Sequence, residues 1–113
     1  MITRHNRFHG RASIQRLYKS GRAVRTTQLG LRYAPSRRDT YRLAVVVSKK
    51  TAKSAVVRNR IRRRIYEYIR LRAGAFAGSH DLIITVYDAA LAKADHRDVT
   101  TEVEKVLHKA GLV

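Results

Sequence analysis

The sequence predicts a single α+β domain with a mixed sheet. Two strongly apolar runs, residues 43–47 and 81–87, have the β-branched character of central strands. A basic segment with isoleucines at helical spacing lies between them, and further helical patterns occur towards both ends of the chain. A chain of 113 residues is long enough to bury one compact core, so we expect one domain over residues 1–113.

The N-terminal part begins without any clear pattern. Residues 1–9 are basic and lack periodicity, which predicts a flexible arm. The apolar residues of RASIQRLYKS then recur at i, i+3 and i+4, so we predict a helix over about residues 11–20 that Gly21 can end. Residues 22–27 leave room for a short strand.

Three strands are expected after this helix. QLGLRY, residues 28–33, alternates in polarity and predicts a strand with one solvated face, on which Arg32 lies while Tyr33 points inward. APSRRDT contains the only proline and is typical of a turn. The runs 43–47 and 81–87 are the other two strands. Because a long helix separates them, we predict a β-α-β unit with parallel strands.

The chain ends in a helical pattern. In DVTTEVEKVLHKAGLV the apolar residues have helical spacing, Asp98 lies near the predicted start and Gly111 follows the predicted end. The predicted order is therefore α-β-β-α-β-α, with one additional short strand possible after the first helix.

A helical wheel divides the basic segment into two faces. The apolar stripe consists of Val57, Ile61, Ile65, Tyr68, Ile69 and Leu71. The opposite side consists of Asn59, Arg62, Arg63, Tyr66 and Arg70, with Arg58, Arg60 and Arg64 at the margins. We expect the stripe to dock on the sheet and Glu67 to pair with Arg63 one turn earlier.

The charge of the chain points to a polyanionic partner. Lys and Arg number 25 against 8 Asp and Glu, which gives a formal net charge of +17. No apolar run has the roughly 18 residues of a membrane-spanning helix, and no signal peptide or lipidation motif is present. We therefore expect a cytoplasmic protein without a membrane partner, and the absence of cysteine excludes disulfides.

The arginine face itself favours nucleic acid over a merely solvated helix. A solvated face usually alternates in sign, whereas this helix carries seven arginines and one acidic residue. Arginine suits bidentate phosphate contacts and stacking on bases. Lys49, Lys50 and Lys53 precede the helix, where they oppose its dipole, so a bound phosphate explains them better than helix propensity does.

At this point the motifs identify a family. RLAVVVSKKTAKSAVVRNRIRRRIYE, residues 42–67, resembles the protein subunit of bacterial ribonuclease P, which has a strand ending in Ser-Lys-Lys followed by an Arg-Asn-Arg helix. The resemblance extends to the Asn-Arg-Phe start at residues 6–8 and to a first helix that ends in Lys-x-Gly. It covers nearly the whole chain.

The resemblance implies both fold and function. It implies the order α-β-β-β-α-β-α with a left-handed β-α-β crossover, against the usual right-handed rule. It also implies a monomer in a 1:1 complex with a catalytic RNA, which removes the 5′ leader of precursor tRNA by Mg²⁺-dependent hydrolysis. In that family the RNA holds the catalytic metal ions, so the protein would carry no catalytic or metal-binding residue of its own.

The resemblance also implies two sets of binding residues. Contacts to the catalytic RNA would come from Arg58, Asn59, Arg60, Arg62, Arg63, Lys49, Lys50 and Lys53. Contacts to the leader of precursor tRNA would come from Phe8, Ile14, Tyr18, Arg32 and Tyr33. This chain departs from the family pattern where Arg32 replaces an aromatic residue and Tyr66 a basic one.

Other functions are less consistent with the sequence. The acidic residues form no motif of a two-metal nuclease, and His5 and His9, at i and i+4, lack the further ligands of a zinc site. A DNA-binding regulator would need a helix-turn-helix pattern, which is missing. A small basic ribosomal-type RNA-binding protein is the main alternative, and it predicts co-purification with ribosomal subunits.

Overall fold

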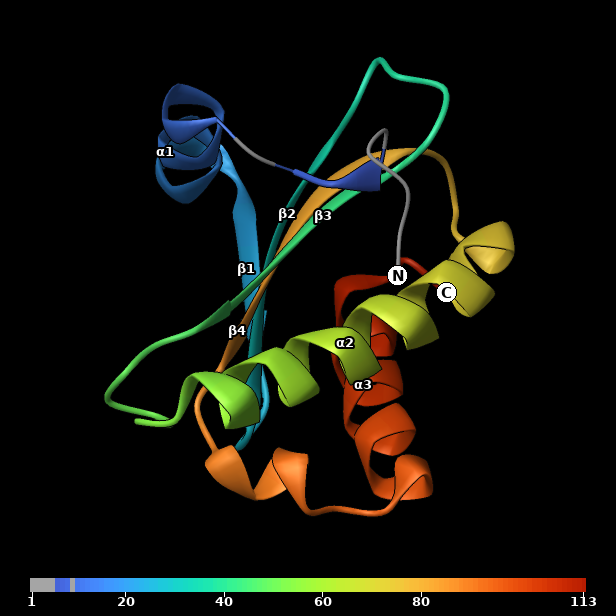
Figure 1. Ribbon diagram of the computed structural model, residues 1–113. Helices are drawn as coiled ribbons and strands as arrows, with labels where there is room; N and C mark the ends of the chain where they lie inside the picture. The colour runs from blue at the N-terminus through green and yellow to red at the C-terminus, as the bar shows by residue number, and fades with distance from the viewer. Residues whose placement is uncertain (1–5, 9) are drawn as a thin grey trace.

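The computed structural model describes residues 6–8 and 10–113; His5 and His9 lie outside them. The elements of the described chain are α1 Arg11–Ser20, β1 Arg22–Arg25, β2 Leu29–Pro35, β3 Arg42–Val47, α2 Ala55–Arg72, η2 Ala73–Ala75, β4 His80–Val86, η3 Ala89–Ala92 and α3 His96–Ala110. The sheet lies between α1 on one face and α2 with α3 on the other (Figure 1). The predicted α+β class is confirmed.

The four strands form one mixed sheet in the order β1-β2-β4-β3. β2 runs antiparallel to both β1 and β4, whereas β3 runs parallel to β4. A parallel pair needs a crossover connection, and α2 supplies it. The predicted β-α-β unit is therefore confirmed, as is the short strand expected within residues 22–27.

The main core lies between the sheet and the pair of helices α2 and α3. Alternate strand residues point into it, such as Leu31 of β2 and Ile84 of β4. The isoleucines of the predicted stripe are fully buried there, with 1%, 0% and 0% of the side chain exposed for Ile61, Ile65 and Ile69. Burial of an isoleucine contributes roughly 1.5 to 3 kcal/mol, so these three residues hold α2 against the sheet.

Two glycines end helices for different reasons. Gly21 has an extended backbone, with φ of −75°, but a Cβ there would lie 2.6 Å from the Leu17 carbonyl oxygen and 3.2 Å from that of Tyr33. Glycine is needed because α1 approaches β2 closely. Gly111 has the left-handed φ of 76° that favours glycine, and its N–H donates to the His108 carbonyl at 3.0 Å. Both predicted helix ends are confirmed.

Several side chains of α2 differ from what the sequence predicted. Leu71 is 67% exposed instead of buried, because it lies at the margin of the apolar stripe, one residue before the helix ends. The ion pair of Glu67 is with Arg70, at 2.5 Å, whereas we predicted Arg63. Arg64 turns inward and donates to two backbone carbonyls in and just after η3, at 3.2 and 2.5 Å. Arg64 is therefore not part of the outward arginine face.

The described end of the predicted N-terminal arm belongs to the packed domain. Arg7 forms a parallel bridge with Leu43, and the Phe8 N–H donates to the Leu43 carbonyl at 2.9 Å. The Asn6 side chain donates to a backbone carbonyl just before β3 at 2.8 Å. Residues 6–8 therefore cover part of the outer edge of β3, which differs from a flexible arm over residues 1–9.

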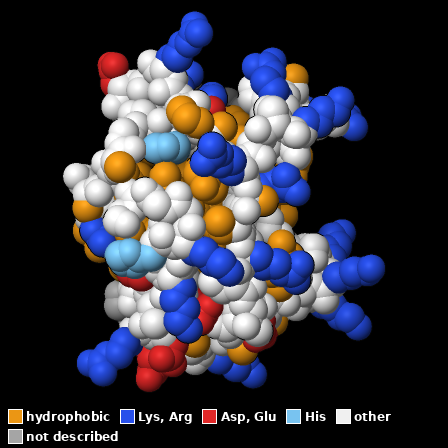
Figure 2. Space-filling model, turned by 180° about the vertical axis from the view of Figure 1, so that it is seen from behind, with side chains coloured by type: hydrophobic (Ala, Val, Ile, Leu, Met, Phe, Trp, Pro, Cys, Tyr) orange, Lys and Arg blue, Asp and Glu red, His pale blue; other side chains and the backbone are white. Residues whose placement is uncertain are grey.

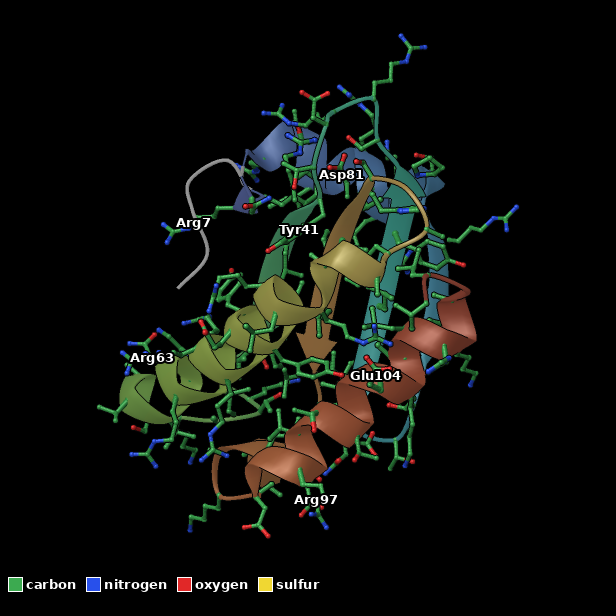
Figure 3. The ribbon with its side chains drawn as sticks, turned by 90° about the vertical axis from the view of Figure 1, so that its right-hand side faces the viewer. Arg7, Tyr41, Arg63, Asp81, Arg97 and Glu104 are labelled. Atoms are coloured by element: carbon green, nitrogen blue, oxygen red, sulfur yellow. The ribbon has the colours of Figure 1, made fainter. Side chains whose placement is uncertain are left out.

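Glu104 of α3 joins the end of α2 to α3 (Figure 3). Its carboxylate accepts hydrogen bonds from the Arg72 guanidinium at 2.5 and 3.1 Å and from the Tyr68 hydroxyl at 2.6 Å. The imidazole of His108 lies 3.2 Å away. The Arg72 guanidinium, followed by the Tyr68 hydroxyl and the charge of His108, lowers the pKa of Glu104 below its usual value of 4.5, although burial opposes this.

We expect these interactions to make stability sensitive to acid. A carboxyl group whose pKa is lowered by folding stabilises the fold above its unfolded pKa of 4.5, and this contribution is lost as the pH falls through the folded value. Glu104→Gln should therefore cost about 1 kcal/mol at neutral pH and much less at about pH 3, as measured by urea unfolding.

The control for this prediction is Asp39→Asn. Asp39 is exposed between β2 and β3 and forms no ion pair within the part of the chain that the structure describes. Its substitution should leave the pH dependence of unfolding close to that of the wild type. An equal loss for Glu104→Gln at both pH values would contradict an ionic contribution.

Candidate RNA interface

The outer side of α2 presents the predicted cluster of polar and cationic side chains. Asn59, Arg60 and Arg63 are exposed, and Arg58 and Arg62 are partly buried. The helix has no acidic residue in its first turn. These five residues do share the solvent-facing side of a helix that buried isoleucines hold in place, and their positive charge is largely available to a partner.

Arg58 has a structural task in addition to its predicted role. Its Nη1 group donates to the carbonyls of Ala52 and Lys53, both at 2.9 Å. These bonds fasten the loop that enters α2. Arg58 therefore fixes the position of Lys53 relative to the helix, which wheel geometry did not indicate.

A hollow of about 430 Å³ lies beside the arginine face. It is lined by Arg7, Asn59, Arg62, Arg63 and Tyr66. The Arg62 Nη1 group donates to the Asn59 side-chain oxygen at 2.9 Å, which holds one wall in place. Arg7 and Arg63 lie on the same side of the molecule in Figure 3. The hollow thus combines three guanidinium groups, an amide and an aromatic ring, a set of groups that suits a phosphate and a base.

Tyr66 lies between the hollow and the core, whereas the wheel placed it on the solvent side. It is partly buried against the core, and its hydroxyl accepts a hydrogen bond from the Val45 N–H at 3.3 Å. Val45 belongs to β3, an edge strand, so this bond satisfies a group that the sheet leaves unpaired. The ring remains part of the wall of the hollow.

Arg7 is the interface residue that the prediction missed. Its backbone bridge to β3 brings it beside α2, more than fifty residues later in the chain. The only sign in the sequence that Arg7 has a role was the Asn-Arg-Phe motif at residues 6–8. That motif does not indicate which surface of the protein Arg7 joins.

The three predicted lysines lie on the connection between β3 and α2, and all are exposed: Lys49, Lys50 and Lys53. The connection is well anchored. The Thr51 N–H donates to the Ser48 carbonyl at 3.1 Å, and the Thr51 hydroxyl donates to the Val86 carbonyl at the end of β4 at 3.3 Å. Ser54 then caps α2 by accepting from the Val57 N–H at 3.4 Å. The lysines are therefore presented by an ordered turn.

A second candidate surface lies between α1 and the sheet. The Arg32 guanidinium donates to the Tyr18 carbonyl at 2.8 Å, and its carbon lies 5.2 Å from the centroid of the Tyr18 ring. Tyr18 is 40% exposed. Ile14 is partly buried behind it, in the small core between α1 and the sheet. The structure therefore brings Ile14, Tyr18 and Arg32 together, as the leader prediction requires.

Two residues assigned to the leader do not meet this surface. Tyr33 lies on the opposite face of the sheet, against the main core and near His80, because successive residues of β2 alternate between faces. Phe8 is only 3% exposed and packs with Leu17 and Ile83. Phe8 therefore lies beneath the surface and supports it, and it has no ring face free for stacking.

The acidic residues mostly have structural partners. Asp81 accepts two hydrogen bonds from Arg42, both at 2.8 Å, and Asp88 caps η3 by accepting from the Ala90 N–H at 2.9 Å. No three His, Asp or Glu side chains converge on a possible metal site within the described ranges.

Lysine and arginine outnumber aspartate and glutamate in this chain, 25 against 8. Figure 2 shows lysine and arginine spread over one face, while most of the few acidic side chains on that face gather near its lower edge. No helix formed by the described residues combines the length and apolar character needed to cross a bilayer.

Comparisons with known proteins agree with this picture. The family described as Ribonuclease P matches residues 2–111. The "Ribonuclease P protein component" of Synechococcus sp. (strain WH7803) is 34% identical over 94% of this chain and 93% of that protein. The protein of the same description from Syntrophobacter fumaroxidans is 36% identical over 96% and 92%.

Solved structures show the same fold. An RNase P protein mutant of Staphylococcus aureus with defective mRNA degradation activity is 28% identical and superposes with a TM-score of 0.85, over 96% of this chain and 91% of that one. The RNase P protein of Thermotoga maritima, at 20% identity, supports the fold alone, with a TM-score of 0.81 over 91% and 96%. The chain therefore belongs to the ribonuclease P protein family, whose function is the processing of the 5′ end of tRNA.

Proposed function

We propose that this chain binds a catalytic RNA through the outer face of α2 and helps that RNA remove the 5′ leader of precursor tRNA. The observation that carries this proposal is the hollow walled by Arg7, Asn59, Arg62, Arg63 and Tyr66. Guanidinium groups bind phosphates in bidentate fashion and stack on bases. Arg58 and Arg60 extend the surface along the helix, and Lys49, Lys50 and Lys53 extend it into the preceding turn.

We place the active site in the RNA. The described residues contain no group of three His, Asp or Glu side chains that could hold a metal ion. The Mg²⁺ that the reaction requires would be held by the RNA and the substrate. The contribution of the protein is to neutralise phosphates and to position RNA strands, in a complex of one protein and one RNA in the cytoplasm.

We assign the leader to the surface between α1 and the sheet. Tyr18 and Arg32 offer a ring and a guanidinium side by side, and both can stack on an unpaired base. Ile14 supports them, while Tyr33 and Phe8 are excluded by their positions. Arg32 thus takes the place of the aromatic residue that the family favours here.

Reconstituted cleavage tests the proposal. Precursor tRNA, the cognate catalytic RNA and this protein are combined at low Mg²⁺, and each is omitted in turn. The protein alone should be inert, and its addition should increase cleavage by the RNA. Cleavage by the protein without RNA would overturn the placement of the active site. A failure to stimulate cleavage, combined with co-purification with ribosomal subunits, would favour a ribosomal-type protein.

A single substitution tests the leader assignment. Tyr18→Ala should weaken binding of precursor tRNA by about 5- to 30-fold, because base stacking is worth about 1 to 2 kcal/mol. Binding of mature tRNA, which lacks the leader, should be unchanged. The measurement is the Kd of each tRNA for the protein–RNA complex, with Tyr18→Phe as the control that retains the ring. Equal losses for the two tRNAs would contradict the assignment.

A further inference from the structure

The face of the sheet that α1 partly covers carries three stacks of an arginine on an aromatic ring. The guanidinium carbon lies 4.6 Å from the ring centroid for Arg42 and Phe8, 5.2 Å for Arg32 and Tyr18, and 4.1 Å for Arg25 and Tyr87. Strand pairing places them in three successive rows, at the β4 positions Asp81, Ile83 and Thr85. The first stack is buried and the second belongs to the proposed leader surface; the third has no role so far.

The third stack is positioned by a glycine. Gly30 of β2 is paired with Arg25 of β1 and with Thr85 of β4, so it lies in the middle of the row. A Cβ at Gly30 would lie 2.6 Å from the Tyr87 hydroxyl oxygen and 3.0 Å from a ring carbon. The Tyr87 side chain therefore folds back across the sheet into the space that Gly30 leaves.

This row is exposed, unlike the apolar surface elsewhere on the sheet. Tyr87 is 42% exposed and belongs to neither core cluster. Val46, which is paired with Thr85 in the same row, is 37% exposed. Among the described residues only five large apolar side chains are exposed, and three of them, Tyr18, Val46 and Tyr87, lie on this one face. The face is thus an apolar strip that continues beyond α1.

Charge defines the kind of molecule that fits this strip. Arg32 and Arg25 lie on it, and Asp81 of the same face is already bound by Arg42 through two hydrogen bonds of 2.8 Å. Asp88, which follows Tyr87, accepts hydrogen bonds from the Gln28 side chain at 3.1 Å and from the Ala90 N–H at 2.9 Å. An exposed ring beside an unneutralised guanidinium matches an unpaired base with its phosphate. A duplex offers no free base faces, and an acidic peptide offers charge but few planar groups.

We propose that Arg25 and Tyr87 form a base-binding subsite for an unpaired nucleotide of single-stranded RNA, next to the one at Tyr18 and Arg32. Adjacent rows of one face are about 6.6 Å apart, which is on the order of two stacked nucleotides of a strand. The proposal rests on the proposed function, because it extends the path of the leader along the sheet towards the basic turn after β3.

The test uses precursor tRNAs in which 2-aminopurine replaces successive leader bases, bound to the complex of protein and catalytic RNA. Stacking quenches 2-aminopurine fluorescence. We expect Tyr87→Ala to remove quenching at one leader position and Tyr18→Ala to remove it at a neighbouring one. Tyr87→Ala should also weaken binding of precursors with leaders long enough to reach the subsite by about 5- to 30-fold, and leave precursors with shorter leaders unaffected.

Two further variants separate stacking from folding. Gly30→Ala retains the ring but displaces it from the sheet, so it should reproduce the effect of Tyr87→Ala, whereas Tyr87→Phe should bind like the wild type. Leu71→Ala, which shortens an apolar side chain on α2 that is 67% exposed against 42% for Tyr87, is the control. Thermal unfolding of each variant shows whether the fold is intact.

The outcomes distinguish this subsite from the proposed function. If the wild type gains no affinity from any leader, the leader assignment itself fails. If the wild type gains affinity with leader length and Tyr87→Ala retains all of that gain, the subsite alone is overturned. The subsite would also be overturned if Tyr87→Ala weakened the binding of mature tRNA to the same extent. The same holds if the wild type bound an acidic peptide at this strip in preference to single-stranded RNA.

Discussion

Replacing Arg60 and Arg63 together by alanine should lower the affinity of this protein for the catalytic RNA about 100-fold. Both side chains are exposed, and within the described part of the chain neither forms an ion pair. A hydrogen bond to a charged group contributes about 1.5 kcal/mol or more, and the removal of two such bonds amounts to about a hundredfold in Kd. The measurement is a titration of labelled RNA at several salt concentrations.

The salt dependence gives a second readout of the same variant. Neutralising a phosphate releases counterions, so the slope of log affinity against log salt should become shallower by about 0.7 to 0.9 for each phosphate that the variant no longer neutralises. The matched control is Lys93→Ala with Arg97→Ala, which removes the same charge from exposed positions outside α2. Arg97 lies on α3 (Figure 3). Equal effects for both pairs would show that only net charge matters, and would contradict a specific interface on α2.

Sequence reasoning succeeded where one local pattern decides the outcome. The spacing of Ile61, Ile65 and Ile69 predicted the docking face of α2, and all three are buried. The alternation along β2 placed Tyr33 inward, whereas the family resemblance assigned it to the leader; the structure agrees with the alternation. Where the two disagreed, the periodicity of this chain was the better guide to where a side chain points.

The failures concern interactions between distant segments. Arg64 turns towards η3 and Arg7 joins the hollow beside α2 because of how the chain folds back, which no local spacing encodes. The space that Gly30 leaves for Tyr87 likewise depends on two strands being neighbours. The left-handed sense of the β-α-β crossover is implied by the family resemblance alone, because no pattern in the residues indicates it, and it stays a prediction.

Ile65→Ala should destabilise the protein by about 3 kcal/mol, because removal of a fully buried isoleucine leaves a cavity and typically costs 2 to 5 kcal/mol. Ile65 is 0% exposed and lies in the middle of α2, directly beneath the arginine face. A loss of this size is a large part of the stability of a small domain. The midpoint of urea unfolding should fall clearly, and the matched control Leu71→Ala, 67% exposed on the same helix, should change it little.

The same variant links the core to RNA binding. A partner that binds only the folded state stabilises it by about 2.7 kcal/mol when its concentration is 100 times its Kd, so the catalytic RNA should restore most of the stability that Ile65→Ala loses. A polyanion also relieves the self-repulsion of a chain with a net charge of +17. If RNA stabilised the wild type but not Ile65→Ala, the buried isoleucines would be required for the shape of the RNA-binding surface as well as for packing α2 on the sheet. If RNA stabilised neither protein, the folded protein would not bind the catalytic RNA, which would contradict the proposed function.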